Sequence, residues 1–163
     1  MQKVDREILD LLREDSRLTP KNIAAAVGIS EDEAKKRVRA LEESGVIVSY
    51  TAIINAEELE EEVVEALIEV KVTPQRGHGF DKIAKEIAAH GEVKNLYLMS
   101  GGYDLAVIVQ GNSLRAVSRF VSEKISTYDT VISTATHFIL KKYKVEGADM
   151  TAKEGGARLS VQA

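Results

Sequence analysis

The fold is decided by residues 23–50, IAAAVGISEDEAKKRVRALEESGVIVSY. This stretch predicts a short helix, a glycine turn, a second helix and then an apolar strand. Gly28 is placed to take a left-handed conformation at the end of the first helix. Ser30 and Glu33 have the spacing of a capping box, which marks the start of the second helix. The pattern is typical of a helix-turn-helix, whose second helix commonly enters the major groove of DNA. The alternative is an ordinary helical hairpin with a solvated charged face.

The second helix carries an apolar stripe and several basic residues. Ala34, Val38 and Leu41 recur at three- and four-residue spacing, so they predict the buried side. Four basic residues are expected off that stripe, where they would contact phosphates or base edges: Lys35, Lys36, Arg37 and Arg39. Ser30 and Glu33 would set the start of this helix. Three residues at the start of the preceding helix are candidates for binding backbone phosphate: Thr19, Lys21 and Asn22.

Composition limits the classes of function. The chain has 163 residues, 44% of them hydrophobic, which is enough for packed cores, and it has no cysteine. Disulfides, thiolate chemistry and cysteine-based metal sites are therefore excluded. No apolar run is long enough to cross a membrane, and no basic and then apolar leader opens the chain. We expect a soluble, cytoplasmic protein without a structural metal or cofactor.

The net charge of −4 is unusual for a DNA-binding protein. Residues 1–55 contain nine Lys and Arg against ten Asp and Glu, so this part of the chain is nearly neutral. Glu31, Asp32 and Glu33 at the start of the second helix complement the helix dipole but repel phosphate. Non-specific affinity for DNA should therefore be modest and should fall steeply with salt. An oligomer that presents two or more such helices would compensate by avidity.

The chain is expected to divide near residue 60. Residues 1–55 form the helix-turn-helix domain, 56–62 an acidic linker, 63–146 a second domain and 147–163 a flexible tail. In the second domain, strands are predicted over residues 63–72, 93–99, 103–109 and 131–140, with amphipathic helices after the first and third strands. This β-α-β-β-α-β order predicts an α+β fold of the ferredoxin-like type, with both helices on one face of an antiparallel sheet. The other face also carries apolar residues, which predicts a homodimer formed sheet to sheet.

The loop before the third strand is the candidate ligand site. Two adjacent glycines let backbone N–H groups turn toward an anion, and an aromatic ring and a carboxylate follow them. A free amino acid has a carboxylate and an ammonium group that such a loop would match. The candidate residues are Gly101, Gly102, Tyr103 and Asp104. The alternative is a tight turn in which Asp104 binds backbone amides. Thr134 and Thr136 share one face of the last strand and are weaker candidates.

Catalysis has little support in the sequence. We find no serine–histidine–acid arrangement, no phosphate loop and no pair of carboxylates in an apolar setting. His78 lies in a glycine-flanked loop, His90 near the end of a predicted helix and His137 on the predicted last strand. None of these histidines has the neighbours that a catalytic role requires, so we predict that the protein is not an enzyme.

Residues 4–144 together resemble the Lrp/AsnC family of regulators, also called feast/famine regulatory proteins. The resemblance rests on VDREILDLLREDSR at residues 4–17, VGISEDEAKKRVRALEESGVIVSYTAIIN at 27–55, GGYD at 101–104 and TVISTATHFILKKYK at 130–144. It implies a winged helix-turn-helix joined to a β-α-β-β-α-β ligand-sensing domain of the RAM type. It also implies dimers that assemble further, usually into octamers, and an amino acid effector bound between subunits near the GGYD loop.

The resemblance predicts a transcriptional regulator that binds double-stranded DNA in response to an amino acid. Effector binding would shift the packing of dimers and so change the spacing of the DNA-reading helices. Two alternatives stay open at this point. Siroheme decarboxylases have a similar two-domain architecture and would require His78 or His137 at a tetrapyrrole pocket. An architectural protein would coat DNA without sequence preference.

Overall fold

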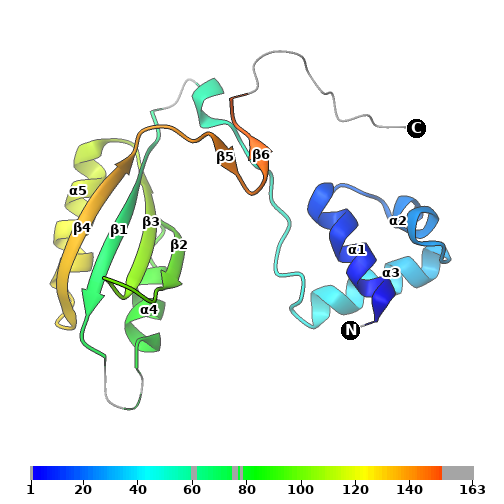
Figure 1. The fold of residues 1–163 in the computed structure, drawn as a ribbon, viewed down its shortest axis with the longest axis horizontal. Coiled ribbons are helices and arrows are strands. Elements are labelled where there is room, and N and C mark those ends of the chain that lie inside the picture. Colours follow the sequence, from blue (N-terminus) through cyan, green and yellow to red (C-terminus); the bar gives the residue numbers. More distant parts are fainter. Residues whose placement is uncertain (1, 60–61, 75–76, 78, 152–163) are drawn as a thin grey trace. The chain divides into compact units, whose positions relative to one another are not determined.

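The computed structural model describes residues 2–59, 62–74, 77 and 79–151 (Figure 1). The chain divides into two compact units, Met1–Ile53 and Ile54–Ala163, and each is described by itself. The predicted limits of the domains and of the linker stay a prediction, although the division of the chain into a helical unit and a β-containing unit agrees with the sequence pattern.

The first unit contains three helices. They are α1 (Lys3–Glu14), α2 (Pro20–Val27) and α3 (Glu31–Glu43). Helix α2 starts at the N-cap Thr19, whose side chain accepts a hydrogen bond from the Asn22 N–H, and it has proline in its first turn. Helices α2 and α3 are the two that the sequence pattern of residues 23–50 predicts.

The core of the first unit is small. Its buried members come from all three helices, and Ile8 and Ala34 are 0% exposed. Partly buried aliphatic side chains, among them Leu12 and Val38, pack around it. The buried residues of this core are Ile8, Ile23, Ala24, Ala34 and Leu41. The apolar stripe predicted for α3 is therefore confirmed.

The apolar strand predicted after the second helix is wrong, because residues 46–54 do not form one. No strand is present in this segment of the described chain, although its β-branched residues favour extended structure. The Val48 side chain is 88% exposed, and Val46 is 52% exposed. A strand needs a second strand to satisfy its N–H and C=O groups, and no described segment pairs with residues 46–54. Composition alone therefore does not produce a strand here.

The second unit is built on a four-stranded antiparallel sheet. Its strands are β1 (Val64–Val72), β2 (Val93–Leu98), β3 (Leu105–Gly111) and β4 (Val131–Ile139), and its helices are α4 (Asp81–Ala88) and α5 (Leu114–Glu123). The strand order is β2-β3-β1-β4, so the two central strands are β3 and β1. The unit also contains two short 3-10 turns, Ala56–Glu58 and Ile125–Thr127. The β-α-β-β-α-β prediction is confirmed.

The main core lies between this sheet and its two helices, which cover the same face (Figure 1). Strand β1 shows why: Ala66, Ile68 and Val70 are 0% exposed, whereas the residues between them are only partly buried. Ile87 of α4 and Val117 of α5 pack against these strand residues. The strand predicted over residues 63–72 and the two predicted amphipathic helices are therefore confirmed.

The predicted start of the C-terminal tail, residue 147, is too early in the sequence. Lys144–Val145 (β5) and Ala148–Asp149 (β6) form a short antiparallel hairpin. Glu146 and Gly147 make its turn with φ values of 46° and 88°, the positive values that tight hairpins of this kind require. Met150 follows the hairpin and is 8% exposed. Residues 152–163 lie outside the described part of the chain.

Candidate functional site

The turn between α2 and α3 has the geometry of a helix-turn-helix. Gly28 adopts φ 75° and ψ 36°, and the amides of Gly28 and Ile29 both donate to the Ala24 carbonyl. These bonds end α2 within one residue. The Ser30 Oγ then accepts a hydrogen bond from the Glu33 amide at 3.2 Å, which starts α3. The predicted turn and the Ser30 cap are both confirmed.

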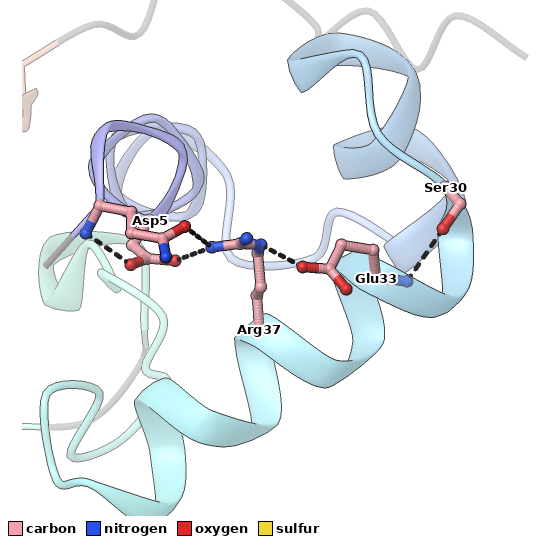
Figure 2. A network of polar contacts seen from close by, with 5 residues as sticks. Asp5, Ser30, Glu33 and Arg37 are labelled. Atoms are coloured by element: carbon pink, nitrogen blue, oxygen red, sulfur yellow. Dashed lines mark hydrogen bonds and ion pairs between the residues drawn. The ribbon is translucent and has the colours of Figure 1, made fainter.

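The second half of the predicted capping box is different. The Glu33 carboxylate is paired with Arg37, one turn later on the same helix, and its Oε1 lies 2.7 Å from Arg37 Nε (Figure 2). A guanidinium four residues toward the C-terminus attracts a carboxylate more strongly than a neutral backbone N–H does. The helix start therefore depends on Ser30, while Glu33 belongs to a charged network.

The basic residues of α3 fall into two groups. Lys35 and Arg39 form surface pairs with Glu31 and Glu43, at 2.7 Å and 2.9 Å, and the side chains in these pairs are 46% to 79% exposed. Exposed i,i+4 pairs stabilise a helix only slightly, so both cations can exchange their partner for a phosphate. The pairing of Glu31 with Lys35 also reduces the repulsion expected from the acidic first turn of α3.

Arg37 differs from these surface cations. Its side chain is 22% exposed and its Nη1 donates to Asp5 Oδ1 at 2.8 Å and to Gln2 Oε1 at 2.9 Å (Figure 2). The Arg37 Nε–H does not point at Glu33 Oε1, so the 2.7 Å contact is an ion pair without hydrogen-bond geometry. The expectation that Arg37 lies off the buried stripe is wrong, because residue 37 is three positions after Ala34 and four before Leu41.

Few cations of the first unit remain without a carboxylate partner. Residues 2–53 are all described and contain nine Lys and Arg, six of which make an ion pair within 4.0 Å. Those without such a pair in this unit are Arg6, Lys21 and Lys36. Lys36 is on α3, and Lys21 is in the first turn of α2, the helix that precedes the turn. The predicted candidates Thr19 and Asn22 are exposed, and their side chains hydrogen-bond to each other.

The loop at residues 101–104 packs its carboxylate against the sheet. Asp104 Oδ2 accepts a hydrogen bond from the Val72 N–H at 2.9 Å, and the Asp104 N–H donates to the Val70 carbonyl at 3.1 Å. The register of β1 against β4 shifts between Lys71 and Val72. The Asp104 carboxylate accepts the hydrogen bond of the Val72 N–H at that irregularity. Asp104 therefore binds one backbone amide, as that alternative expects, but the amide belongs to β1 and not to the loop itself.

The rest of the loop stays accessible. Gly101 and Gly102 are exposed, and a Cβ added at either would meet nothing within 4 Å. Tyr103 is partly buried. A ligand can therefore approach this backbone closely, which is what the predicted anion-binding loop requires.

The two predicted threonines do not join this loop within one chain. Thr134 and Thr136 pair with Val70 and Ile68, so they share one face, as predicted, and the structure shows that it is the helix-covered face. Thr134 Oγ1 lies 3.4 Å from Ser126 Oγ in the turn after α5. Strand β1 separates β4 from β3, so Thr134 and the start of β3 are about 10 Å apart, the width of two strand spacings.

Sites for metals are not apparent. The described residues contain no cluster of three or more His, Cys, Asp or Glu side chains that could hold a metal ion. His90 Nε2 lies 3.1 Å from Tyr128 Oη, so this histidine anchors the end of α4 to the turn after α5. His137 is on the sheet surface, as predicted, 3.3 Å from Glu69. His78 lies outside the described residues.

A hollow of about 480 Å³ lies at the opposite end of β3 from the Gly101–Asp104 loop. Its lining includes charges of both signs, from Glu92, Arg119, Glu123 and Lys124. The sequence pattern did not single it out, because its residues come from β3, α5 and the turn before β2.

Among the described helices, none combines the length and the apolar character that crossing a bilayer requires.

Comparison with known families assigns both units. Residues 1–48 match the sequence model described as "Winged helix-turn-helix DNA-binding", and residues 65–149 match the one described as "Lrp/AsnC ligand binding domain". The second match covers more than half of the chain. The chain belongs to the Lrp/AsnC family of transcriptional regulators. The predicted fold class, a winged helix-turn-helix followed by a RAM-like α/β domain with a four-stranded antiparallel sheet, is confirmed with it.

Individual Lrp/AsnC relatives align over nearly the whole chain. The HTH-type transcriptional regulator YugG of Bacillus subtilis is 47% identical over 158 residues, which is 96% of this chain and 95% of YugG. The crystal structure of the leucine response regulatory protein of Mycobacterium tuberculosis aligns with a TM-score of 0.76 at 25% identity, over 92% of this chain and 99% of that one. A Neisseria meningitidis transcriptional regulator in complex with L-Met shares the fold, with a TM-score of 0.72 at 24% identity over 89% and 93% of the two chains.

The protein is therefore a DNA-binding transcriptional regulator with a ligand-binding domain, and it belongs to a family that is not enzymatic. The prediction that it is no enzyme is confirmed by this membership, and the siroheme decarboxylase alternative is not supported. The site residues proposed from the sequence are not tested by the comparisons, and they enter the proposals below.

Proposed function

We propose that this regulator binds DNA in a sequence-specific manner and that a small effector, an amino acid, changes that binding in the cytoplasm. The observation that carries the proposal is the joining of a capped, exposed α3 to a ligand-binding domain with an accessible glycine loop at the end of its sheet. The first unit supplies the output and the second supplies the response. For the effector to change DNA binding, it must bind the DNA-bound and the DNA-free protein with different affinities.

For DNA, we propose Lys36 as the main contact of α3, with Lys35 and Arg39 exchanging their surface partners for phosphates. Lys21, Thr19 and Asn22 would bind backbone phosphate at the start of α2, where helix N–H groups favour anions. Ser30 would fix the start of the reading helix. The pairing of six cations in residues 2–53 disfavours an architectural protein, because non-specific binding depends on unpaired positive charge.

For the effector, we propose the loop Gly101, Gly102, Tyr103 and Asp104. Its backbone is open to a carboxylate, and Asp104 places a negative charge close by for an ammonium group. Two similar proteins support this class of ligand, since one is named a leucine response regulatory protein and another was solved as an L-Met complex. Thr134 and Thr136 are weaker candidates, because β1 separates β4 from the loop within one chain.

For assembly, we propose a homodimer that covers the open face of the sheet and associates further, to an octamer. Register places Tyr97, Ala106 and Leu67 on the face away from the helices, and the Tyr97 side chain is 51% exposed. Apolar residues on an exposed sheet face favour a partner subunit over water. Two or more copies of α3 would also strengthen DNA binding by avidity.

A thermal-shift screen against each common amino acid tests the effector class. We expect one amino acid, or a few of related shape, to raise the melting temperature of the second unit, because a ligand that binds only the folded state stabilises it. Light scattering on the same samples would report a change of oligomer size. If no amino acid alters the melting temperature, the oligomer or DNA affinity, the effector proposal is wrong.

The pair Asp104→Asn and Asp104→Ala separates binding from folding. Asparagine keeps an oxygen for the Val72 amide, whereas alanine removes it. We expect Asp104→Asn to keep the fold and basal DNA binding and to lose the effector response. A normal response of Asp104→Asn in a gel-shift titration would contradict the proposed site.

A further inference from the structure

Two charged residues of the first unit lie next to the buried apolar residues of their helices. Asp5 is three positions before Ile8 on α1, and Arg37 is three positions after Ala34 and four before Leu41 on α3. Ile8 and Ala34 are 0% exposed and Leu41 is 7% exposed. Side chains three or four positions apart share one face of a helix. The side chains of Asp5 and Arg37 therefore point toward the contact between α1 and α3 and not toward the exposed side of α3.

The contacts between them join the beginning of α1 to the middle of α3. Figure 2 shows the Arg37 guanidinium between Asp5 and Glu33. Its Nη1 donates both to Asp5 Oδ1, at 2.8 Å, and to Gln2 Oε1, at 2.9 Å. The side chains of Arg37 and Asp5 are 22% and 17% exposed, whereas those of Arg39 and Glu43 are 79% and 66% exposed. Screening by water is correspondingly weaker in the Asp5–Arg37 pair.

Asp5 has a second task at the same place. Its Oδ2 accepts a hydrogen bond from the Gln2 N–H at 2.9 Å, which closes the N-terminus of α1. That backbone bond and the Arg37 guanidinium lower the pKa of the Asp5 carboxyl, so Asp5 is ionised at neutral pH. If Arg37 moved away to a DNA phosphate, a largely buried carboxylate would lose its cation. Breaking a partly buried pair in this way is costly.

We infer that Arg37 is a positioning residue of the DNA-reading helix: it holds α3 against the start of α1 through Asp5 and Gln2 and does not contact DNA. The inference rests on the proposed role of α3 as the helix that reads DNA. The contacts with DNA then come from the cations on the exposed side, with Lys36 foremost. In this arrangement Asp5, although acidic, favours DNA binding.

The first test compares Asp5→Asn with Asp10→Asn. Both variants remove one negative charge from α1, but Asp10 is 72% exposed and pairs only with Arg13 of its own helix, at 3.8 Å. The probe is the duplex that the wild-type protein selects from a random-sequence pool, at fixed salt. Simple electrostatics predicts that both variants bind it somewhat more tightly. Positioning predicts that Asp5→Asn binds about tenfold more weakly, the loss expected from one charge-assisted hydrogen bond, and that Asp10→Asn does not.

If Asp5→Asn binds the duplex as tightly as the wild type or more tightly, the inference is overturned, because Asp5 would then only restrain a DNA-contacting Arg37. Circular dichroism of both variants at the assay temperature checks that α1 to α3 remain helical. Failure of the wild-type protein to select any duplex would instead contradict the proposed sequence-specific function, so the two failures are distinguishable.

The second test reads the dependence of affinity on salt. Affinity for DNA falls as salt rises. Removing one phosphate contact makes the plot of log affinity against log salt less steep by about one. We expect Lys36→Ala to show that change and Arg37→Lys to bind more weakly with an unchanged slope. Lysine keeps the charge but lacks the planar fork that reaches Asp5, Gln2 and Glu33 together. Wild-type affinity of Arg37→Lys, together with a reduced slope for Arg37→Ala, would identify a phosphate contact and overturn the inference.

Discussion

The two units of this regulator hold their helices by different means. Among the described residues, thirteen buried side chains of the second unit form one core between the sheet and its helices, whereas the buried core of the first unit has five. The first unit adds a charged network in which Arg37 joins α1 to α3. Hydrophobic stabilisation scales with buried apolar area, so polar contacts contribute a larger share in the smaller unit. The DNA-reading unit should therefore be more sensitive to small polar changes than the sensing unit.

The largest effect is expected from Ile8→Ala, with Ile68→Ala as its counterpart in the second unit. Both side chains are 0% exposed, and each truncation should cost about 2–5 kcal/mol of unfolding free energy. We expect Ile8→Ala to abolish the folding transition of the first unit. Ile68→Ala should only lower the melting temperature of the second unit. Calorimetry with hydrogen exchange assigns each transition. A first unit that still melts at the wild-type temperature would contradict the comparison.

The next effect concerns the second unit and Asp104, a partly buried side chain in the proposed effector loop. Asp104→Ala leaves the Val72 N–H, in a residue that is 3% exposed, without its acceptor. An unsatisfied buried donor costs about 1–3 kcal/mol. Chemical denaturation should show this loss, and Asp104→Asn should recover most of it. Equal stability of the alanine and asparagine variants would mean that the Val72 bond contributes little.

Two serine caps allow the same change to be made in both units. Ser30 Oγ accepts from the Glu33 amide at 3.2 Å, and Ser113 Oγ accepts from the Ala116 amide at 3.1 Å. Replacing either serine by alanine should cost about 1 kcal/mol. We expect Ser30→Ala to weaken DNA binding measurably and Ser113→Ala to leave it unchanged. Equal effects on DNA affinity would show that the first unit is not the more sensitive one.

The smallest effect is on pH dependence. The Arg17 guanidinium and backbone amide lower the pKa of Asp15 from 3.8 to about 2, and the pKa of Asp5 is lowered as well. The unfolded chain therefore binds more protons than the folded one in this range, so stability is present above about pH 4 and is lost as the pH falls toward 2. Melting curves should show this in the first unit, and Asp15→Asn should reduce it. The Asp15–Arg17 pair is exposed to solvent, which keeps its contribution small.

Much of the fold follows from local patterns in the sequence. Gly28, Ser30 and the spacing of Ala34, Val38 and Leu41 specify a turn and a capped helix, and the structure has both. The alternation in β1 likewise predicts which side chains are buried. These features depend on residues a few positions apart, so one chain segment contains the information needed to predict them.

The segment at residues 46–54 shows where that reasoning ends. Its β-branched residues favour an extended backbone, but a strand also requires a partner, and the described chain supplies none. The candidate site was only partly predictable for a similar reason. The glycine loop was visible at residues 101–104, whereas the bond from the Val72 amide to Asp104 joins residues 32 positions apart.

The amino-acid sequence by itself determined the elements, the family and the order of the two units, because periodicity, caps and motifs are local. Only the tertiary structure decided the roles of the charged side chains. It placed Arg37 between Asp5 and Glu33, left Lys36 without a carboxylate partner among the described residues, and assigned Asp104 to the Val72 amide. Charge pairing depends on distances between helices and strands, and those distances exist only once the cores have packed.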